Sequence, residues 1–313
     1  MENTTVPSGF SFTVFKDQGQ LKYFFFILTF TVYISIIFFN VNILWVVFKE
    51  RSLHEPMYLF IACLSANALN GTAGFFPRLL IDLLSDTHLI SRPACFTQIF
   101  TIYSYSVSEY TILCLIAYDR YLAICNPLQY HNIMTPKIAS LSVGIVAIYG
   151  TIFVSVVMSL QVRLHFCGTE ISRLYCSSWS VVRLGCGISM KKVYTSGIFI
   201  ATTTVFLPSI YILYTYIRIF IVCQKGSAES RSKALQTCLP HIVSFINYSV
   251  ASLSDIILNR YETENLQVIE LFFSVEFLVT PSILNPLIYG LKLPEMRRKI
   301  LGLYKLPTVI PIL

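Results

Sequence analysis

Long runs of apolar residues, free of aspartate, glutamate, lysine and arginine, recur along the chain. Five runs cover residues 23–48, 56–77, 93–118 with Glu109 as an interruption, 138–162 and 193–217. Each is close to the ~20 residues that a helix needs to cross a hydrocarbon layer ~30 Å thick. Two less uniform candidates, residues 234–254 and 268–291, carry His241, Glu270 and Glu276. The pattern therefore predicts seven membrane spans.

Composition agrees with a membrane protein, because 55% of the residues are hydrophobic and only 12% are charged. A lipid layer offers no water to backbone groups, and the alternating ten-residue segments of a membrane barrel are absent, so the spans must be helices. We therefore expect an all-α membrane protein with a seven-helix bundle over residues 23–291. Residues 1–22 are expected to be an outer tail. Residues 292–313 are expected to form a short amphipathic helix and a tail that meets anionic lipid.

The basic residues predict the orientation of the bundle. With the N-terminus outside, the inner segments carry thirteen basic and five acidic residues, as the positive-inside rule requires. The net charge of +7 then belongs to the inner face, and nucleic acid is not an expected partner. No cleavable signal is evident, so the first span would direct insertion into the plasma membrane. Asn3 begins a glycosylation sequon in the outer tail.

Cysteine usage separates into two groups under this topology. Cys95, Cys167, Cys176 and Cys186 lie outside, and the other five lie within spans or at the inner face. Four thiols in an oxidising compartment favour two disulfides. Their spacing leaves three pairings open.

Asp119 and Arg120 form a charge pair at the inner end of the third span. A carboxylate lets a guanidinium rest partly in the membrane, and breaking such a pair frees the arginine for another partner. This pattern suits a conformational switch. The alternative is an arginine that extends its head group to the interface.

The stretch AYDRYLAICNPLQY at residues 117–130 resembles the signature of olfactory receptors, a family of rhodopsin-like G-protein-coupled receptors. Three further stretches resemble the same family: PMYLF at 56–60, KALQTCLPH at 233–241 and PSILNPLIY at 281–289. The second and sixth spans, with Asn247 and Tyr248, look more like fish receptors than mammalian ones. The resemblance implies a receptor and no enzyme, with no catalytic residues and no cofactor.

The resemblance also implies roles for particular residues. It pairs Cys95 with Cys176 and Cys167 with Cys186. His241 would make a polar bond to the third span in the resting state. The implied coupling and switch residues are Asp119, Arg120, Tyr121, Tyr216, His241, Asn285, Pro286 and Tyr289.

Two of these residues also have a physical reading without the family. Pro286 removes a backbone donor and kinks its helix, and Asn285 can satisfy a freed carbonyl. The alternative is a plain helix break.

Glu109 resembles the acidic residue of a sodium or proton site in this family. The family usually places an aspartate on the second span, where this chain has Ala68 with Asn67 beside it. Sodium binding is therefore doubtful, and no other metal is expected. The alternative is a protonated Glu109 that is hydrogen-bonded to Asn67, Asn70 or Asn285.

A ligand pocket is expected between the outer halves of the third, fifth and sixth spans, as in other receptors of this kind. Its candidate residues are Ile102, Tyr103, Ser106, Val107, Thr203, Phe206, Ser252, Leu253, Ile256 and Arg260. Arg260 would engage a ligand carboxylate, or else pair with Asp255, Glu262 or Glu264. For the aromatic residues, ordinary helix packing is the alternative.

The sequence thus favours an odorant receptor that binds a small molecule, with a water-borne carboxylate as the candidate ligand class, and activates a heterotrimeric G protein of the stimulatory olfactory type. A rhodopsin-like receptor for another small ligand is the first alternative. A transporter or channel is disfavoured by the odd number of spans and by the lack of an inverted repeat.

Overall fold

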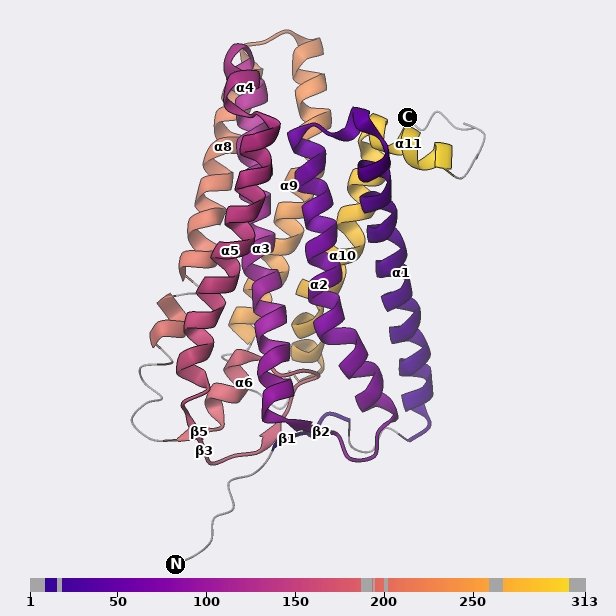
Figure 1. Cartoon of the computed structure of the whole chain (residues 1–313), viewed down its shortest axis with the longest axis vertical. Helices are drawn as coiled ribbons and strands as arrows, with labels where there is room; N and C mark the ends of the chain where they lie inside the picture. The colour runs from indigo at the N-terminus through magenta and orange to yellow at the C-terminus, as the bar shows by residue number, and fades with distance from the viewer. Residues whose placement is uncertain are drawn as a thin grey trace, which may run out of the picture.

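The computed structural model describes residues 9–15, 19–186, 193, 195–199, 202–258 and 267–303. Long helices run side by side along the length of the molecule (Figure 1). They are α1 (Leu21–Lys49), α2 (Pro56–Leu84), α3 (Arg92–Cys125), α5 (Pro136–Gln161), α8 (Leu207–Gln224), α9 (Ala228–Leu258) and α10 (Gln267–Lys292). The seven-helix prediction is therefore confirmed.

Within the described residues, five segments are long and apolar enough to cross a membrane: α1, α2, α3, α5 and Thr195–Gln224, which includes α8. The helices α9 and α10 are of similar length but carry buried polar residues such as His241, Ser244 and Asn285. Polar groups inside a span face the bundle interior, where they find partners.

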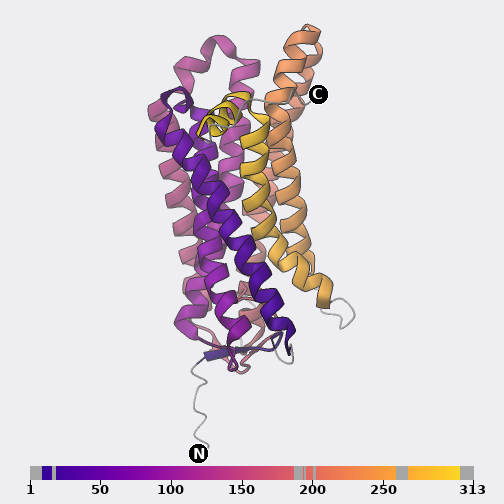
Figure 2. The same ribbon diagram turned by 90° about the vertical axis from the view of Figure 1, so that its right-hand side faces the viewer.

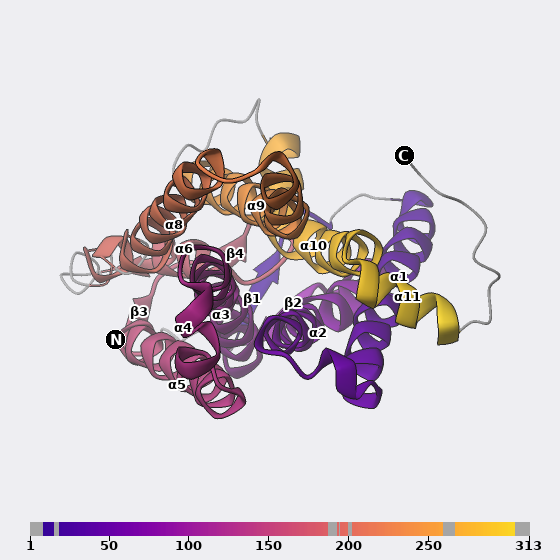
Figure 3. The same ribbon diagram turned by 90° about the horizontal axis from the view of Figure 1, so that it is seen from above.

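The helix α3 is central to the bundle, as the view along its axis shows (Figure 3). It packs against α2, α5, α8 and α9. By contrast, α1, α5 and α8 expose large apolar side chains, including Trp45, Ile148 and Leu213. An apolar surface of this kind fits contact with lipid.

Short elements close the two ends of the bundle (Figure 2). One end carries β1 (Gly9–Phe12), β2 (Leu89–Ser91), β3 (His165–Phe166), β4 (Glu170–Ile171), β5 (Gly185–Cys186) and α6 (Ser178–Arg183); we call it the strand end. The other carries η1 (Arg51–Leu53), α4 (Pro127–Ile133) and α11 (Pro294–Leu303); we call it the α4 end.

Residues 9–12, expected to belong to a simple tail, form a strand in the folded strand end. The strand β1 lies antiparallel to β2 and parallel to β4. Phe10 and Phe12 are almost fully buried, and the guanidinium groups of Arg92 and Arg78 lie over their rings. Alternating buried phenylalanines are a strand pattern, but a run of four residues was too short to be recognised.

At the α4 end, α11 folds back onto the bundle through Leu293 and Met296, which are buried. Lys299 pairs with Glu50 just after α1. This hydrogen bond lowers the pKa of the half-buried Glu50 carboxyl. The helix begins at Pro294, which suits a first helical position because proline lacks the donor that would be unpaired there.

Candidate functional site

A cavity of about 180 Å³ lies toward the strand end, between α3, α5, α6, α9 and α10. Six of the ten residues predicted for the ligand pocket line it: Ile102, Tyr103, Ser106, Val107, Ser252 and Ile256. The helical spacing of α3 and α9 brings these six residues to the same cavity. That they contact a ligand remains a prediction.

The predicted residues of the fifth span are displaced from the cavity. Thr204 and Val205 line it, whereas Thr203 and Phe206 do not, and Phe206 is 47% exposed. The reason is a π-helical stretch at Thr202–Phe206. The wider turns of a π-helix rotate the side chains relative to a regular α-helix. No feature of the sequence indicates the π-helical stretch.

Three further residues predicted from the sequence either lie away from the cavity or fall outside the described residues. Leu253 is half-buried against the core and does not line the cavity. Arg260 and the sequon residue Asn3 lie outside the described residues, so the proposals about them rest on sequence alone.

Several cavity residues were missed. The helix α5 contributes Phe153, Val154, Val157 and Met158, and α6 contributes Trp179. Their apolar pattern does not distinguish a cavity face from a lipid face. Asp255 also lines the cavity, and an acidic residue within a span was a signal that could have identified it.

The short helix α6 covers the cavity and is tied at both ends. Cys176 precedes it and pairs with Cys95, with Cα atoms 5.5 Å apart. Cys186 follows it and pairs with Cys167, with Cα atoms 5.9 Å apart. Both are the pairings expected from the resemblance. Gln161 at the end of α5 donates to Ser178 at the start of α6.

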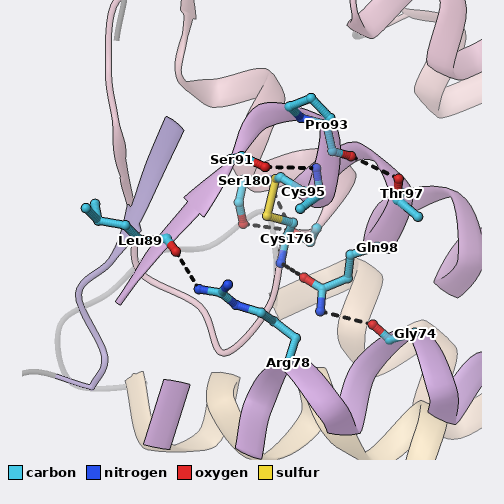
Figure 4. Close-up of a disulfide and its surroundings, with 12 residues drawn as sticks. Gly74, Arg78, Leu89, Ser91, Pro93, Cys95, Thr97, Gln98, Cys176 and Ser180 are labelled. Atoms are coloured by element: carbon cyan, nitrogen blue, oxygen red, sulfur yellow. Dashed lines mark hydrogen bonds between the residues drawn. A yellow bond between two sulfur atoms is a disulfide. The ribbon is translucent and has the colours of Figure 1, made fainter. Parts of the chain in front are cut away.

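Gln98 adds a second connection beneath the first disulfide (Figure 4). Its side-chain oxygen accepts from the Cys176 backbone N–H at 2.9 Å, and its amide nitrogen donates to the Gly74 carbonyl at 3.2 Å. The loop, α3 and α2 are thereby joined at one point, which fixes the roof of the cavity.

Two tyrosines connect the cavity to the interior. The Tyr248 hydroxyl lies 2.9 Å from Oγ of Ser106, a cavity residue. The Tyr105 hydroxyl donates to the Phe277 carbonyl at 3.4 Å, and the Phe277 residue lines the cavity too. Pro281 cannot donate to that carbonyl, its partner in a regular helix, so Tyr105 supplies the missing donor.

A buried carboxyl lies one helical turn below Tyr105. Asn67 donates to Oε2 of Glu109 at 2.8 Å and Asn285 donates to Oε1 at 2.8 Å. Asn67 also donates to the Tyr105 carbonyl, which fixes its amide orientation. Asn70, the third candidate partner, is exposed.

This arrangement does not fit a sodium ion. Both carboxylate oxygens of Glu109 face amide N–H groups, and a cation would require oxygen atoms there instead. Ala68 supplies no oxygen from its side chain. Over the described part of the chain, no group of three histidine, cysteine or acidic residues could hold a metal ion.

The kink of α10 has a different partner from the one expected. Pro286 leaves the Ser282 carbonyl without its helical donor. The amide of Asn40 in α1 donates to that carbonyl at 2.8 Å. Asn285 bonds Glu109 instead. The expectation that Asn285 would satisfy the freed carbonyl is therefore wrong, and nothing in the sequence linked α1 to this position.

Asp119 and Arg120 form the expected pair at the α4 end. Arg120 Nε donates to Asp119 Oδ2 at 2.9 Å, and the aspartate side chain is fully buried. The other oxygen, Oδ1, accepts from the Tyr130 hydroxyl of α4 at 2.8 Å. Burial, together with the Asp119 carboxylate, raises the pKa of Tyr130, so the phenol stays protonated and donates. Tyr130 ends the family stretch but was not singled out.

His241 bonds a different span from the one expected. Its Nδ1 lies 3.1 Å from the Tyr289 hydroxyl of α10, whereas a bond to the third span was expected. Nε2 of His241 is buried without a hydrogen-bond partner among the described residues.

Tyr121 and Tyr216 are half-buried and pack around Cys223 and Cys238, between α3, α8 and α9.

Comparison with known proteins places these features in a family. The family model described as "Olfactory receptor" matches residues 29–305. Human olfactory receptor 51E1 is 30% identical over 281 residues, which cover 89% of this chain and 87% of the relative. Human olfactory receptor 14J1 is 31% identical over 312 residues, 98% of this chain and 96% of the relative. Human olfactory receptor 52K1 is 30% identical over 270 residues, 85% of each.

Proposed function

Because this chain belongs to the olfactory receptor family of G-protein-coupled receptors, which are not enzymes, we propose that it is an odorant receptor. It binds a small molecule in the cavity beneath α6 and activates a heterotrimeric G protein of the stimulatory olfactory type. The strand end faces outward and the α4 end faces the cytoplasm of a cell whose plasma membrane holds the bundle. Asn3 would then be available for glycosylation.

The connection between the cavity and the interior supports this proposal most directly. Ser106 and Phe277 belong to the cavity lining and also bond Tyr248 and Tyr105. A ligand that displaces either lining residue changes a contact made by α9 or α10. Glu109, the kink of α10 and the Asp119–Arg120 pair follow in the direction of the α4 end. Agonist binding favours a state in which α9 swings outward and Arg120 leaves Asp119.

The cavity lining also constrains the ligand. Most of its described residues are apolar, with a few hydroxyl groups, Gln161 and Asp255 as polar anchors. Such a lining suits a small, mainly apolar molecule with one polar group. We retain the sequence-based proposal that this group is a carboxylate bound by Arg260, and the test of it follows in the Discussion.

A screen in cells tests the receptor proposal. Cells that express the chain, the stimulatory olfactory G protein and a cyclic-nucleotide reporter are exposed to short acids, amino acids, bile-acid-like compounds and nucleotides. Val107→Trp fills the cavity, and we expect it to weaken the response to any agonist by well over tenfold at equal surface level. Val250→Trp, a lipid-facing change on α9 at a position that is 55% exposed, is the matched control. Equal responses of the two variants would contradict the assigned cavity.

The same cells separate the alternatives. Substrate flux without a second-messenger response would identify a transporter. A response confined to compounds that are not odorants would identify a receptor of the same fold with another ligand.

A further inference from the structure

Three of the five free cysteines meet at the α4 end of the bundle. Cys125 ends α3, Cys223 lies near the end of α8, and Cys238 lies in α9. Cys223 and Cys238 are buried in one hydrophobic cluster, and Cys125 packs against it. Cys63 and Cys114 belong to other parts of the bundle and do not join this cluster.

A second cavity, of about 60 Å³, lies between α8 and α9 in the same place. Cys223 and Cys238 both line it, and Cys125 does not. The cavity also has polar lining from Gln224 and Arg231, both of which are exposed to solvent. A space of ~10–15 Å³ admits one water molecule, so this cavity can admit a molecule the size of hydrogen peroxide.

We propose that Cys223 and Cys238 form an oxidation-sensitive staple that joins α8 to α9. Hydrogen peroxide transfers one oxygen atom to the sulfur of Cys223, the more exposed of the two, which gives a sulfenic acid and one water molecule. The sulfur of Cys238 then attacks this sulfur, the S–O bond breaks, and the hydroxyl leaves with the thiol proton as a second water molecule. The two thiols are oxidised to one disulfide, and the peroxide is reduced to water.

The effect of the staple on signalling rests on the proposed function. Activation requires the inner end of α9 to move away from α3 and α8, and a covalent bond between α8 and α9 at this level opposes that movement. The oxidised receptor is therefore held in its resting state, and a thiol reductant releases it. The location at the cytoplasmic end means that the thiols are reduced under ordinary conditions.

Chain cleavage tests the staple without any signalling readout. A cleavage site for a sequence-specific protease replaces residues 225–227, between α8 and α9. The two native disulfides lie on the N-terminal side of this cut, so only a new disulfide can hold the fragments together. After hydrogen peroxide treatment and cleavage, we expect linked fragments on a non-reducing gel and separate fragments after reduction.

Single substitutions assign the bond. Cys223→Ser and Cys238→Ser should each give separate fragments after oxidation. Cys125→Ser and the matched control Cys63→Ser should leave them linked. Separate fragments from the oxidised receptor with all its native cysteines would overturn the staple, as would linkage that persists in Cys223→Ser.

Nucleotide exchange tests the consequence. Receptor in lipid nanodiscs is mixed with a purified stimulatory heterotrimer, and agonist-independent uptake of a GTP analogue is measured before and after peroxide. We expect a several-fold decrease that reduction reverses and that Cys223→Ser does not show. If the linked and the unlinked receptor both support nucleotide exchange, and do so at equal rates, the proposed effect of the staple on signalling is wrong. Failure of the reduced receptor to support any exchange would instead contradict the proposed function and leave the cross-linking result standing.

Discussion

Single side chains from neighbouring helices complete the backbone of α10. Pro281 and Pro286 each remove one helical donor, and Tyr105 and Asn40 donate to the two carbonyls that are freed. A buried carbonyl without a donor costs about 1–3 kcal/mol, so these two side chains stabilise a helix to which they do not belong. Tyr105 is further constrained because a Cβ on Gly71 would lie 2.5 Å from its ring.

Asn40→Leu keeps the volume of the side chain approximately but removes its donor. We expect it to lower the free energy of unfolding by about 1–3 kcal/mol, because the Ser282 carbonyl then lacks a partner. Thermal denaturation of purified receptor measures the loss. Asn42→Leu is the control, because Asn42 lies two residues away on α1, is half-buried and donates to the Phe38 carbonyl of its own helix. Equal melting temperatures for both variants would show that Asn40 does not support the kink.

Arg120 is expected to act in coupling and not in holding the fold. Arg120→Ala should abolish the cyclic-nucleotide response while the receptor remains measurable at the cell surface. Tyr130→Phe removes one of the two side chains that donate to Asp119, and we expect it to raise agonist-independent signalling, because the resting pair is less well held. An unchanged agonist response of Arg120→Ala at equal surface level would rule out the switch.

The hypothesis that the ligand has a carboxylate group rests on Arg260. If a ligand carboxylate docks there, Arg260→Ala should cost ~2–5 kcal/mol of binding, which weakens potency by well over tenfold. Arg260→Lys should recover only part of this loss, because an ammonium lacks the planar fork. If Arg260 pairs with a loop carboxylate in water, the cost should stay under ~1 kcal/mol. Dose-response curves for an acidic agonist and its methyl ester decide, since an equal small shift for both excludes the carboxylate contact.

At the scale of elements, the apolar runs predicted the helices and several of their contacts. Regular helical spacing placed Ile102 and Ser106 on the cavity, and two adjacent charges at the end of an apolar run identified the Asp119–Arg120 pair. The errors arose where the chain departs from regular geometry or where the partner is distant in sequence. The π-helical turn before α8 displaced Thr203 and Phe206. Asn40 and Ser282 are 242 residues apart. The residue pattern of a single sequence carries no signal of such a contact.

The helix α6 is the element whose attachment is easiest to test. Cys95→Ser and Cys176→Ser should each reduce the amount of receptor at the cell surface, because each removes the same bond. The double variant should be no worse than either single variant, as expected for two partners in a double-mutant cycle. Flow cytometry of surface receptor measures this. Additive losses would mean that the two cysteines do not act together.

At the scale of the whole molecule, the two ends of the bundle differ in what holds them. The strand end is held by two disulfides and two small sheets. The α4 end is held by charge pairs and hydrogen bonds, including Asp119–Arg120, Glu50–Lys299 and His241–Tyr289. Covalent bonds keep the cavity in shape, whereas noncovalent contacts can exchange partners. A receptor that opens at one end needs this difference.

The position of β1 has a consequence for biosynthesis. This strand is made among the first residues of the chain, yet its parallel partner β4 (Glu170–Ile171) leaves the ribosome only after the first four spans have been made. In the proposed orientation, Phe10 and Phe12 therefore remain in the lumen of the secretory pathway without their partners until β4 is made, and exposed apolar side chains are ligands for chaperones. The sheet of β1, β2 and β4 can form only after the first half of the bundle has been inserted and folded correctly. The opening segment of the chain is thus positioned to act as a maturation checkpoint, and an epitope tag inserted between residues 9 and 12 would interfere with export before it could interfere with odorant binding.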